Sequence, residues 1–220
     1  MIIAIDGPAG SGKSTTAKKV AGQLNLMHLD TGSMYRAVAL YILDQDIVGF
    51  HLNDHNQITQ ILDEIKIEFS NESNNIFLNG KDVSVDIREN RVSEFVSEVS
   101  AISLVRERMV LLQREIATGN DVVLEGRDIG TRVFPNADVK IFLNADVNER
   151  GQRRFKELME RGEEITLESV IREIESRDLK DSSREHSPLE KAKDAVEIDT
   201  TKLSIDAQVN EIVSLIETNN

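Results

Sequence analysis

The 220-residue sequence predicts an α/β protein built on a doubly wound parallel sheet. Short apolar runs rich in β-branched residues recur along the chain, and each is followed by a turn or helix signal, as is typical of buried parallel strands. Amphipathic helical patterns lie between these runs. One segment, residues 65–85, breaks the alternation and predicts a small antiparallel unit inserted into the α/β core.

Local patterns place each element. Apolar residues of segments 65–69 and 76–78 flank a polar turn at 70–75, and Asn79-Gly80 predicts a second tight turn after them. Parallel strands are expected at residues 2–5, 122–124, 139–143 and 196–198, with another short strand ending at residues 28–30. Apolar spacings of three and four predict helices over residues 13–24, 34–43, 92–118, 148–161 and 167–177.

The charge balance limits the possible partners. The formal net charge is −13, from 26 basic and 39 acidic side chains. The chain therefore lacks the broad basic face that supplies non-specific affinity for nucleic acid or anionic membranes. An anionic ligand must meet a local cluster of basic groups, and eleven of the fifteen arginines fall between Arg106 and Arg177.

Other features of the composition concern the compartment. The chain has no cysteine, which excludes disulfides and allows a reducing compartment. The N-terminal residues carry no basic segment of the kind that begins a signal peptide. The longest apolar stretch, residues 37–43, is far below the roughly 20 residues needed to cross a bilayer. We expect a cytoplasmic protein without a membrane partner.

The strongest motif is a glycine-rich loop between the first strand and the first helix. Residues 7–14 match G-x-x-x-x-G-K-[ST], which indicates a P-loop that binds nucleotide phosphates. Its glycines let backbone N–H groups point at phosphate oxygens, and the helix dipole adds positive potential. Lys13 is expected to reach the β- and γ-phosphates, and Ser14 to offer its hydroxyl to Mg²⁺. The predicted nucleotide-binding residues are Gly7, Pro8, Ala9, Gly10, Ser11, Gly12, Lys13, Ser14 and Thr15.

This motif indicates a cofactor but not a reaction, because switches, motors and kinases share it. No N-K-x-D run marks a guanine site, so ATP is the expected nucleotide. Glu125 stands at a strand end, where it either holds a magnesium-bound water or is an ordinary polar residue. The four histidines show no metal-ligand spacing and are interpreted as structural or surface residues.

Two clusters contain groups suited to an acceptor. Residues 28–36 end a strand in a turn, where Thr31 or Ser33 would cap a helix that contains Arg36. Residues 125–131 place an Arg-Asp pair between two glycines at the end of a strand, which is where ligands bind in open α/β sheets.

A third cluster is rich in arginine. Residues 177–184 follow the pattern R-D-x-x-D-x-x-R, and Arg150, Arg153 and Arg154 precede them on a predicted helix. Arginine is suited to bidentate binding of phosphate. Taken singly, each of these arginines also fits a solvated or salt-bridged surface group.

Together these motifs resemble those of a known family. The P-loop, L-D-T-G-S-M-Y-R at 29–36, E-G-R-D-I-G-T at 125–131 and the pattern at 177–184 resemble bacterial cytidylate kinases, which belong to the nucleoside monophosphate kinases. The resemblance extends from residue 2 to about residue 200. It implies phosphoryl transfer from ATP to CMP or dCMP, giving ADP and CDP or dCDP.

The resemblance also implies an architecture. It suggests one P-loop kinase domain with a five-stranded parallel sheet, an inserted monophosphate-binding region that includes the antiparallel unit, and a mobile helical lid. Family members of this kind suggest a monomer. The expected boundaries are about 41–105 for the inserted region, about 146–185 for the lid, and 1–40, 106–145 and 186–220 for the core.

Individual roles follow from the matching motifs. Catalysis would rest on charge neutralisation by Lys13, Arg127, Arg153 and Arg184, with Arg153 facing the transferring group from the lid. The acceptor phosphate would be held by Arg36, Arg127 and Arg184 near Thr31, the sugar by Arg177 and Asp181, and the cytosine edge by Ser97, Arg106 and Asp128.

The chemistry of the base agrees with this reading. Cytosine presents an amino donor at N4, for which Asp128 is a suitable acceptor, and acceptors at N3 and O2 that suit Arg106. Uracil would turn an acceptor toward Asp128, so CMP is expected over UMP by at least about tenfold.

Two other functions stay open from the residues alone. A kinase for another nucleoside monophosphate or small molecule would share the P-loop, but it has no evident need for the Arg177, Asp181 and Arg184 set. A non-enzymatic nucleotide-binding module would bind ATP or GTP without an acceptor pocket. These alternatives are separated by measuring which acceptor, if any, is needed for the release of ADP.

Overall fold

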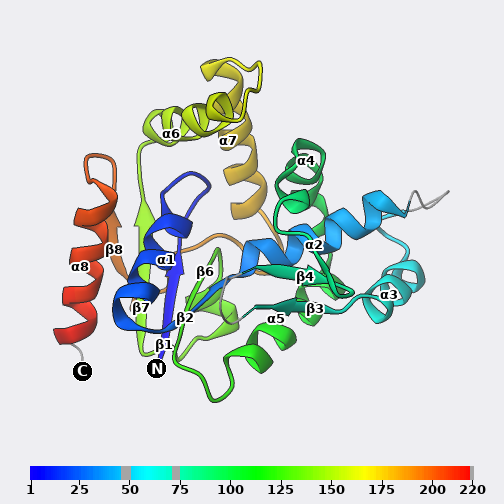
Figure 1. Ribbon diagram of the computed structural model, residues 1–220, viewed down its shortest axis with the longest axis horizontal. Helices are drawn as coiled ribbons and strands as arrows, with labels where there is room; N and C mark the ends of the chain where they lie inside the picture. Colours follow the sequence, from blue (N-terminus) through cyan, green and yellow to red (C-terminus); the bar gives the residue numbers. More distant parts are fainter. Residues whose placement is uncertain (46–50, 71–74, 219–220) are drawn as a thin grey trace. The chain divides into compact units, whose positions relative to one another are not determined.

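The computed structural model describes residues 1–45, 51–70 and 75–218, which contain both strands and helices (Figure 1). These residues form two compact units. The first comprises Met1–His28 together with the chain from Asn120 onward, and the second comprises Leu29–Gly119. The second unit is wider than the expected inserted region at 41–105.

The first unit is built on a five-stranded sheet in the order β2-β6-β1-β7-β8. β1 pairs in parallel with both β6 and β7, and β7 pairs in parallel with β8. The doubly wound parallel sheet of five strands is thereby confirmed. The strands are β1 Ile2–Asp6, β2 Met27–Asp30, β6 Val122–Gly126, β7 Val139–Asn144 and β8 Val196–Asp199.

Parallel pairing brings two loops together at the carboxyl end of this sheet. Asp6, the last residue of β1, pairs with Gly126, the last residue of β6. The P-loop and the segment that begins at Arg127 therefore leave the sheet at neighbouring points. Open α/β sheets bind their ligands at the carboxyl ends of their strands.

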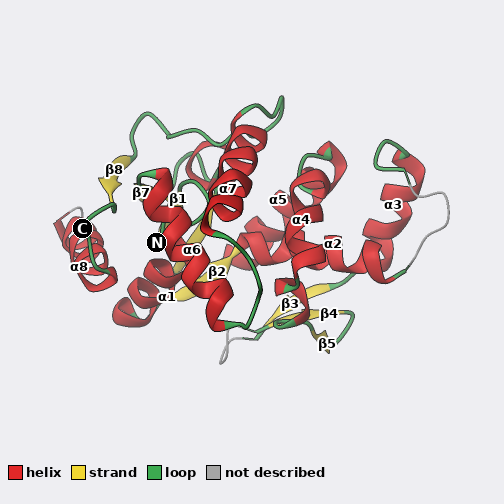
Figure 2. Ribbon diagram, turned by 90° about the horizontal axis from the view of Figure 1, so that it is seen from above, coloured by secondary structure: helices red, strands yellow, loops and turns green. Residues whose placement is uncertain are grey.

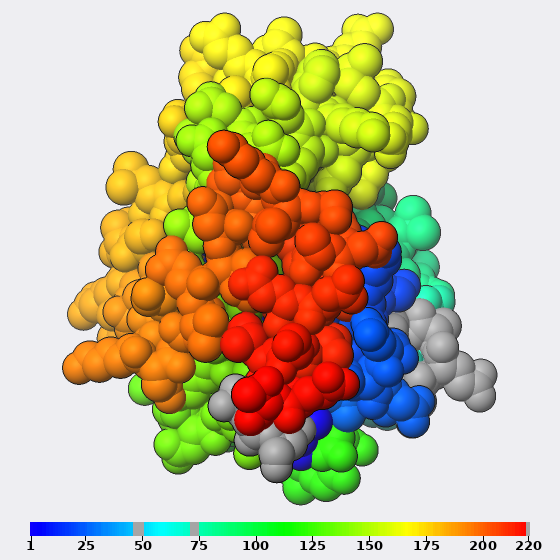
Figure 3. All heavy atoms as spheres, turned by 90° about the vertical axis from the view of Figure 1, so that its left-hand side faces the viewer, coloured from blue at the N-terminus to red at the C-terminus, as the bar shows by residue number. Residues whose placement is uncertain are grey.

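The described residues of the first unit form the α-helices α1 Lys13–Leu24, α6 Val147–Glu160, α7 Leu167–Ser182 and α8 Ile205–Thr218. α8 packs along α1, and Figure 3 shows it in red on one face of this unit. Their apolar faces join the sheet in a core that includes Ile3, Val20, Ile141 and Ile212, all essentially inaccessible to solvent. A short π-helical turn, Ile129–Val133, follows β6.

α6 and α7 pack on one another around a small apolar core of their own (Figure 1). Leu158, Val170 and Ile174 form its centre. Side chains cap both helices, since Asp146 accepts hydrogen bonds from two amides at the start of α6 and Thr166 accepts one at the start of α7. We call α6 and α7 the helical pair.

The second unit combines helices with a three-stranded antiparallel sheet in the order β3-β4-β5, drawn in yellow in Figure 2. The predicted antiparallel insertion is confirmed. Asn79 and Gly80 turn between β4 and β5 with φ values of 50° and 81°, whereas the predicted turn at 70–75 falls largely outside the described residues. The elements are α2 Thr31–Asp44, α3 His55–Glu64, β3 Ile67–Phe69, β4 Ile76–Leu78, β5 Lys81–Asp82, the 3₁₀ turn Asp86–Arg88, α4 Asn90–Val99 and α5 Ser103–Ala117.

Two predictions about helices were wrong. The helix expected over 92–118 is two helices, because α4 ends at Val99 and Ile102 is extended before α5 begins. The cap of α2 is Asp30, in place of Thr31 or Ser33: its side chain accepts the Ser33 amide at 3.1 Å. Helices α3 and α8 were not predicted.

Candidate active site

The P-loop has the backbone geometry of a phosphate cradle. Gly7, Gly10 and Gly12 have φ values of 149°, 74° and 91°, and a Cβ atom at Gly7 would lie 2.1 Å from the carbonyl oxygen of Leu143. No side chain of the described residues caps the first turn of α1. The amides that begin at Lys13 can therefore donate to an anion, with the helix dipole in their favour. These features fit the phosphate groups of a nucleoside triphosphate.

Lys13 occupies this cradle with its ammonium turned inward. Its Nζ donates to Pro8 O at 2.6 Å and to Ser11 Oγ at 3.3 Å. Burial, together with the positive charge of Arg127, lowers the pKa of Lys13 well below its ordinary value. A bound polyanion would offset both effects, so the site favours a ligand with several negative charges.

Ser14 and Glu125 place oxygen atoms beside the cradle. Ser14 Oγ donates to Glu125 Oε2 at 2.5 Å, and Glu125 is a buried residue of β6. Hydroxyl and carboxylate oxygens are the ligands that Mg²⁺ prefers. Within the described part of the chain, no group of three or more His, Asp or Glu side chains could hold a metal ion. A cation here would therefore need further ligands from a nucleotide.

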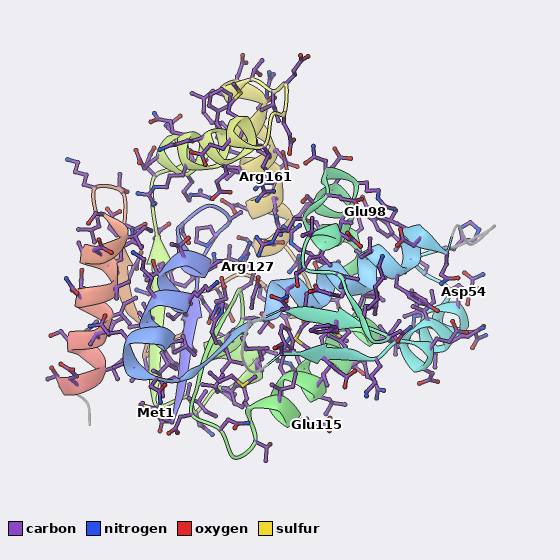
Figure 4. All side chains as sticks on the ribbon, viewed as in Figure 1. Met1, Asp54, Glu98, Glu115, Arg127 and Arg161 are labelled. Atoms are coloured by element: carbon purple, nitrogen blue, oxygen red, sulfur yellow. The ribbon has the colours of Figure 1, made fainter. Side chains whose placement is uncertain are left out.

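An arginine cluster surrounds Asp181 in the same unit. Arg127 Nε donates to Asp181 Oδ2 at 3.0 Å, and Arg184 Nη2 donates to Asp181 Oδ1 at 2.5 Å. Burial raises the pKa of Asp181, but the charges of Arg127, Arg184 and Arg177 outweigh it and hold the pKa below its ordinary value. Figure 4 labels Arg127, which follows β6 directly.

Arg177 gives this cluster an excess of positive charge. Burial and the charge of Arg127 lower the pKa of Arg177 to about 10. Its Nε atom is buried and has no hydrogen-bond partner among the described residues. The charges of Arg127, Arg177 and Arg184 all act on the Asp181 carboxylate, and an anionic ligand would add further negative charge to balance these three guanidinium groups.

Two predicted residues of the first unit have other surroundings. Asp128 is buried directly after Arg127. Arg153 donates from Nη2 to Thr200 O at 2.6 Å and lies 3.4 Å from Glu149. In this structure Arg153 is hydrogen-bonded to the loop after β8. Among the described residues, its hydrogen bonds and its ion pair do not include a residue of the P-loop.

The predicted residues of the second unit are held by that unit's own elements. Thr31 is buried at the start of α2, and Ser97 is buried on α4. Arg36 Nη1 donates to Ser93 Oγ at 2.8 Å. Arg106 Nη1 donates to Ser100 O at 3.1 Å, and its guanidinium lies 5.3 Å from the centre of the Tyr35 ring.

Two further residues contact the P-loop, and the sequence analysis gave neither of them a role of its own. Arg150 Nη1 donates to Ala9 O at 2.9 Å and to Asp178 Oδ2 at 2.5 Å. Asp178 Oδ1 in turn accepts the Ala9 amide at 3.3 Å. The helical pair is therefore hydrogen-bonded to the P-loop backbone through the ion pair of Arg150 and Asp178. Membership of the arginine-rich cluster was the only available signal.

Asp6 supports the segment that follows Arg127. Its carboxylate accepts the amides of Ile129 at 2.8 Å and Gly130 at 2.7 Å. Burial outweighs these hydrogen bonds and raises the pKa of Asp6 to about 6. The sequence signal for Asp6 was an acidic residue at the end of an apolar strand, directly before a glycine-rich loop. That signal did not indicate which amides would donate to Asp6.

A model of the cytidylate kinase family matches residues 3–218. The chain is 47% identical over 217 residues to the cytidylate kinase of Fusobacterium nucleatum, covering 99% of this chain and 97% of that one. It is 49% identical over 216 residues to the cytidylate kinase of Clostridioides difficile, covering 98% of each.

Solved structures share the fold at low identity. Shikimate kinase from Bacteroides thetaiotaomicron superposes with a TM-score of 0.50 at 15% identity, over 99% of this chain and 98% of that one. An uncharacterized protein from Eubacterium ventriosum gives a TM-score of 0.51 at 15% identity, over 99% of each chain. This likeness concerns the fold alone.

Proposed function

Because the chain belongs to the cytidylate kinase family, we propose that it transfers the γ-phosphoryl group of ATP to CMP or dCMP, giving ADP and CDP or dCDP. The chain is an ATP-dependent nucleoside monophosphate kinase. The structural observation that carries the proposal is the position of the arginine cluster. Arg127 and Arg177 lie close enough to Lys13 to lower its pKa, so cationic groups for two phosphate chains share one region.

On the donor side, the P-loop amides and Lys13 bind the triphosphate. Residues Gly7 to Thr15 surround it, and Lys13 leaves its contacts with Pro8 and Ser11 for the β- and γ-phosphates. Ser14 and Glu125 would hold Mg²⁺ together with the nucleotide. When bound, the ion would supply charge neutralisation on the β- and γ-phosphates.

On the acceptor side, Arg127 and Arg184 hold the phosphate of the monophosphate, with Asp181 fixing both guanidinium groups. By the resemblance, Thr31 and Arg36 contact the same phosphate. Arg177 and Asp181 are assigned to the sugar, and Ser97, Arg106 and Asp128 to the base. Arg106 is a buried residue of α5, and a guanidinium group is a suitable donor to the N3 and O2 acceptors of the base.

Transfer requires little covalent chemistry from the protein. The acceptor phosphate is itself the nucleophile, so no strong general base is needed. Lys13, Arg127 and Arg184 offset the repulsion between the two anions as they approach. We assign Arg153 and the rest of a lid at about 146–185 to excluding water, which would otherwise accept the phosphoryl group.

Several properties beyond the reaction are also proposed. The chain acts as a monomer in the cytoplasm, without nucleic acid as a partner, in agreement with its net charge of −13. None of the described helices is long and apolar enough to span a membrane. Size-exclusion chromatography with light scattering tests the monomer, and a mass near twice 24.7 kDa would reject it.

One assay separates the proposed function from its alternatives. ADP release is followed with CMP, dCMP, UMP, AMP and GMP as acceptors, each at the same concentration. Rapid release only with CMP and dCMP is expected. Activity confined to a non-pyrimidine would favour another kinase, and slow release that ignores the acceptor would favour a nucleotide-binding module.

A further inference from the structure

His28 lies inside the proposed donor site, although its sequence context gave it no role. It is a residue of β2, the neighbour of β6 in the sheet (Figure 1). Its Nε2 atom lies 3.1 Å from Glu125 Oε1, and the two side chains are only 9% and 4% exposed. The imidazole therefore meets Glu125 away from bulk water.

The contact extends to the P-loop. Glu125 Oε2 accepts the hydroxyl of Ser14 at 2.5 Å while Oε1 faces His28. An ionised carboxylate only accepts hydrogen bonds, so we assign Nε2 as the donor in this pair. His28, Glu125 and Ser14 form a hydrogen-bonded chain that ends on the residue assigned to the cation.

This chain fixes the position of a flexible side chain. Glutamate has three rotatable bonds, and a contact on each oxygen restricts them all. Glu125 also has an alternative partner, because its charge acts on Lys13 strongly enough to oppose the lowering of that residue's pKa. Without the hydrogen bond to His28, Glu125 loses one of the contacts that hold it beside Ser14, and the attraction of Lys13 opposes that position.

We propose that His28 is a positioning residue that holds Glu125 in place for the magnesium ion carried by ATP. The inference rests on the proposed function, in that it concerns the same donor site. Hydrogen-bond partners of metal-binding groups orient those groups and raise metal affinity. His28 touches neither nucleotide nor metal in this assignment and acts only through Glu125.

The test compares two substitutions of similar size. His28→Leu removes the donor, and His28→Gln keeps an amide N–H that can reach Glu125. Calorimetry measures ATP affinity with Mg²⁺ and with EDTA, and the ratio of the two affinities isolates the contribution of the metal. We expect His28→Leu to lower this ratio by about tenfold, at the small end of such losses, with ATP affinity in EDTA unchanged. His28→Gln should restore most of it.

A matched control separates positioning from loss of stability. Ile212 is a fully buried residue of α8 in the core of the first unit. Ile212→Val weakens the packing of that core and changes no residue of the donor site. Its ratio should equal that of the wild type. An unchanged ratio in His28→Leu, or an equal fall in His28→Leu and His28→Gln, would overturn the proposal.

A second measurement needs no variant. In wild-type protein with ¹⁵N-labelled histidine, MgATP should shift the Nε2 resonance of His28, and ATP in EDTA should not. Equal shifts in the two conditions would also overturn the proposal. Because both experiments measure binding, they stay informative if no acceptor is phosphorylated. That outcome would reject the proposed function instead.

Discussion

Lys13 is an ammonium group in a buried site, hydrogen-bonded to Pro8 O and Ser11 Oγ, with a pKa lowered by burial and by Arg127. Phosphate oxygens would reverse that shift, because an opposite charge at contact favours the protonated form. Nucleotide binding is therefore expected to draw Lys13 out of the loop and to raise its pKa.

This shift predicts that ATP binding takes up protons at a pH that lies between the pKa values of Lys13 in the free and the ATP-bound protein. Calorimetry in buffers of different ionisation enthalpy should show uptake in the wild type and less in Lys13→Ala. Turnover in Lys13→Ala should fall by at least about a hundredfold, the scale for removing one transition-state donor. Lys18→Ala changes an exposed lysine of the same helix and serves as the control. Near-normal turnover in Lys13→Ala would mean that the donor site is misplaced.

Asp6 predicts a pH dependence of stability. Its pKa is raised from 3.8 to about 6, chiefly by burial. Between these values the folded chain holds a proton that the unfolded chain has released, so this contribution is present below the lower value and is lost as pH rises through about 6. The loss amounts to about 2–3 kcal/mol.

Asp6→Asn removes this titration. The free energy of unfolding of the wild type, minus that of the variant, should therefore fall by about 2–3 kcal/mol from about pH 4 to about pH 7. Urea unfolding at several pH values measures the difference and cancels the other acids. A constant difference would contradict the assignment of the raised pKa to Asp6.

Residues in the site differ in how well the sequence predicted them. The spacing of the P-loop motif predicts phosphate binding by Lys13, whereas the roles of Arg127, Asp181 and Arg184 were expected from the family resemblance. His28 contacts a residue 97 positions away, and no local pattern predicts a contact of that kind. Its burial beside Glu125 follows from the order of β2 and β6 in the sheet, which a single sequence does not reveal.

At the scale of elements, the helical pair is tied to the P-loop. Arg150 on α6 and Asp178 on α7 form an ion pair, and each also binds the backbone of Ala9. The guanidinium neutralises a carboxylate that would otherwise lie beside the triphosphate. We infer that this pair positions the loop and keeps its surroundings favourable to anions.

A double-mutant cycle tests this coupling. Arg150→Met should weaken ATP binding by at least about tenfold, because it leaves the Asp178 carboxylate uncompensated. Adding Asp178→Asn to Arg150→Met should recover part of that loss. Arg154→Met is the control, since Arg154 pairs with Glu157 within α6. Simple additivity of Arg150→Met and Asp178→Asn would contradict the coupling.

Element boundaries were harder to predict than element types. Apolar spacing runs on through residues 100–102, so periodicity alone predicts a single helix there. The break between the two helices coincides with hydrogen bonds that periodicity does not reveal. Ser100 Oγ donates to Ser97 O, and Ser100 O accepts a hydrogen bond from Arg106 Nη1. The parallel strands were predicted better, because burial on both faces makes each one a continuous apolar run.

At the scale of the whole molecule, an acidic chain presents a compact cationic site. The net charge is −13, with its acidic excess mainly in residues 41–105 and 185–220. Lys13, Arg127, Arg177 and Arg184 are gathered by the sheet and the helical pair of one unit. We expect such an arrangement to disfavour extended polyanions and to bind two short phosphate chains.

The proposed function requires that the γ-phosphoryl group moves to CMP instead of water. Labelled ATP with ³²P at the γ-position, supplied with CMP or UMP, follows that group directly. We predict that the label appears in CDP, with little free phosphate, and at least about tenfold faster than in UDP because of Asp128. Label that accumulates as free phosphate whichever acceptor is present would contradict phosphoryl transfer to CMP.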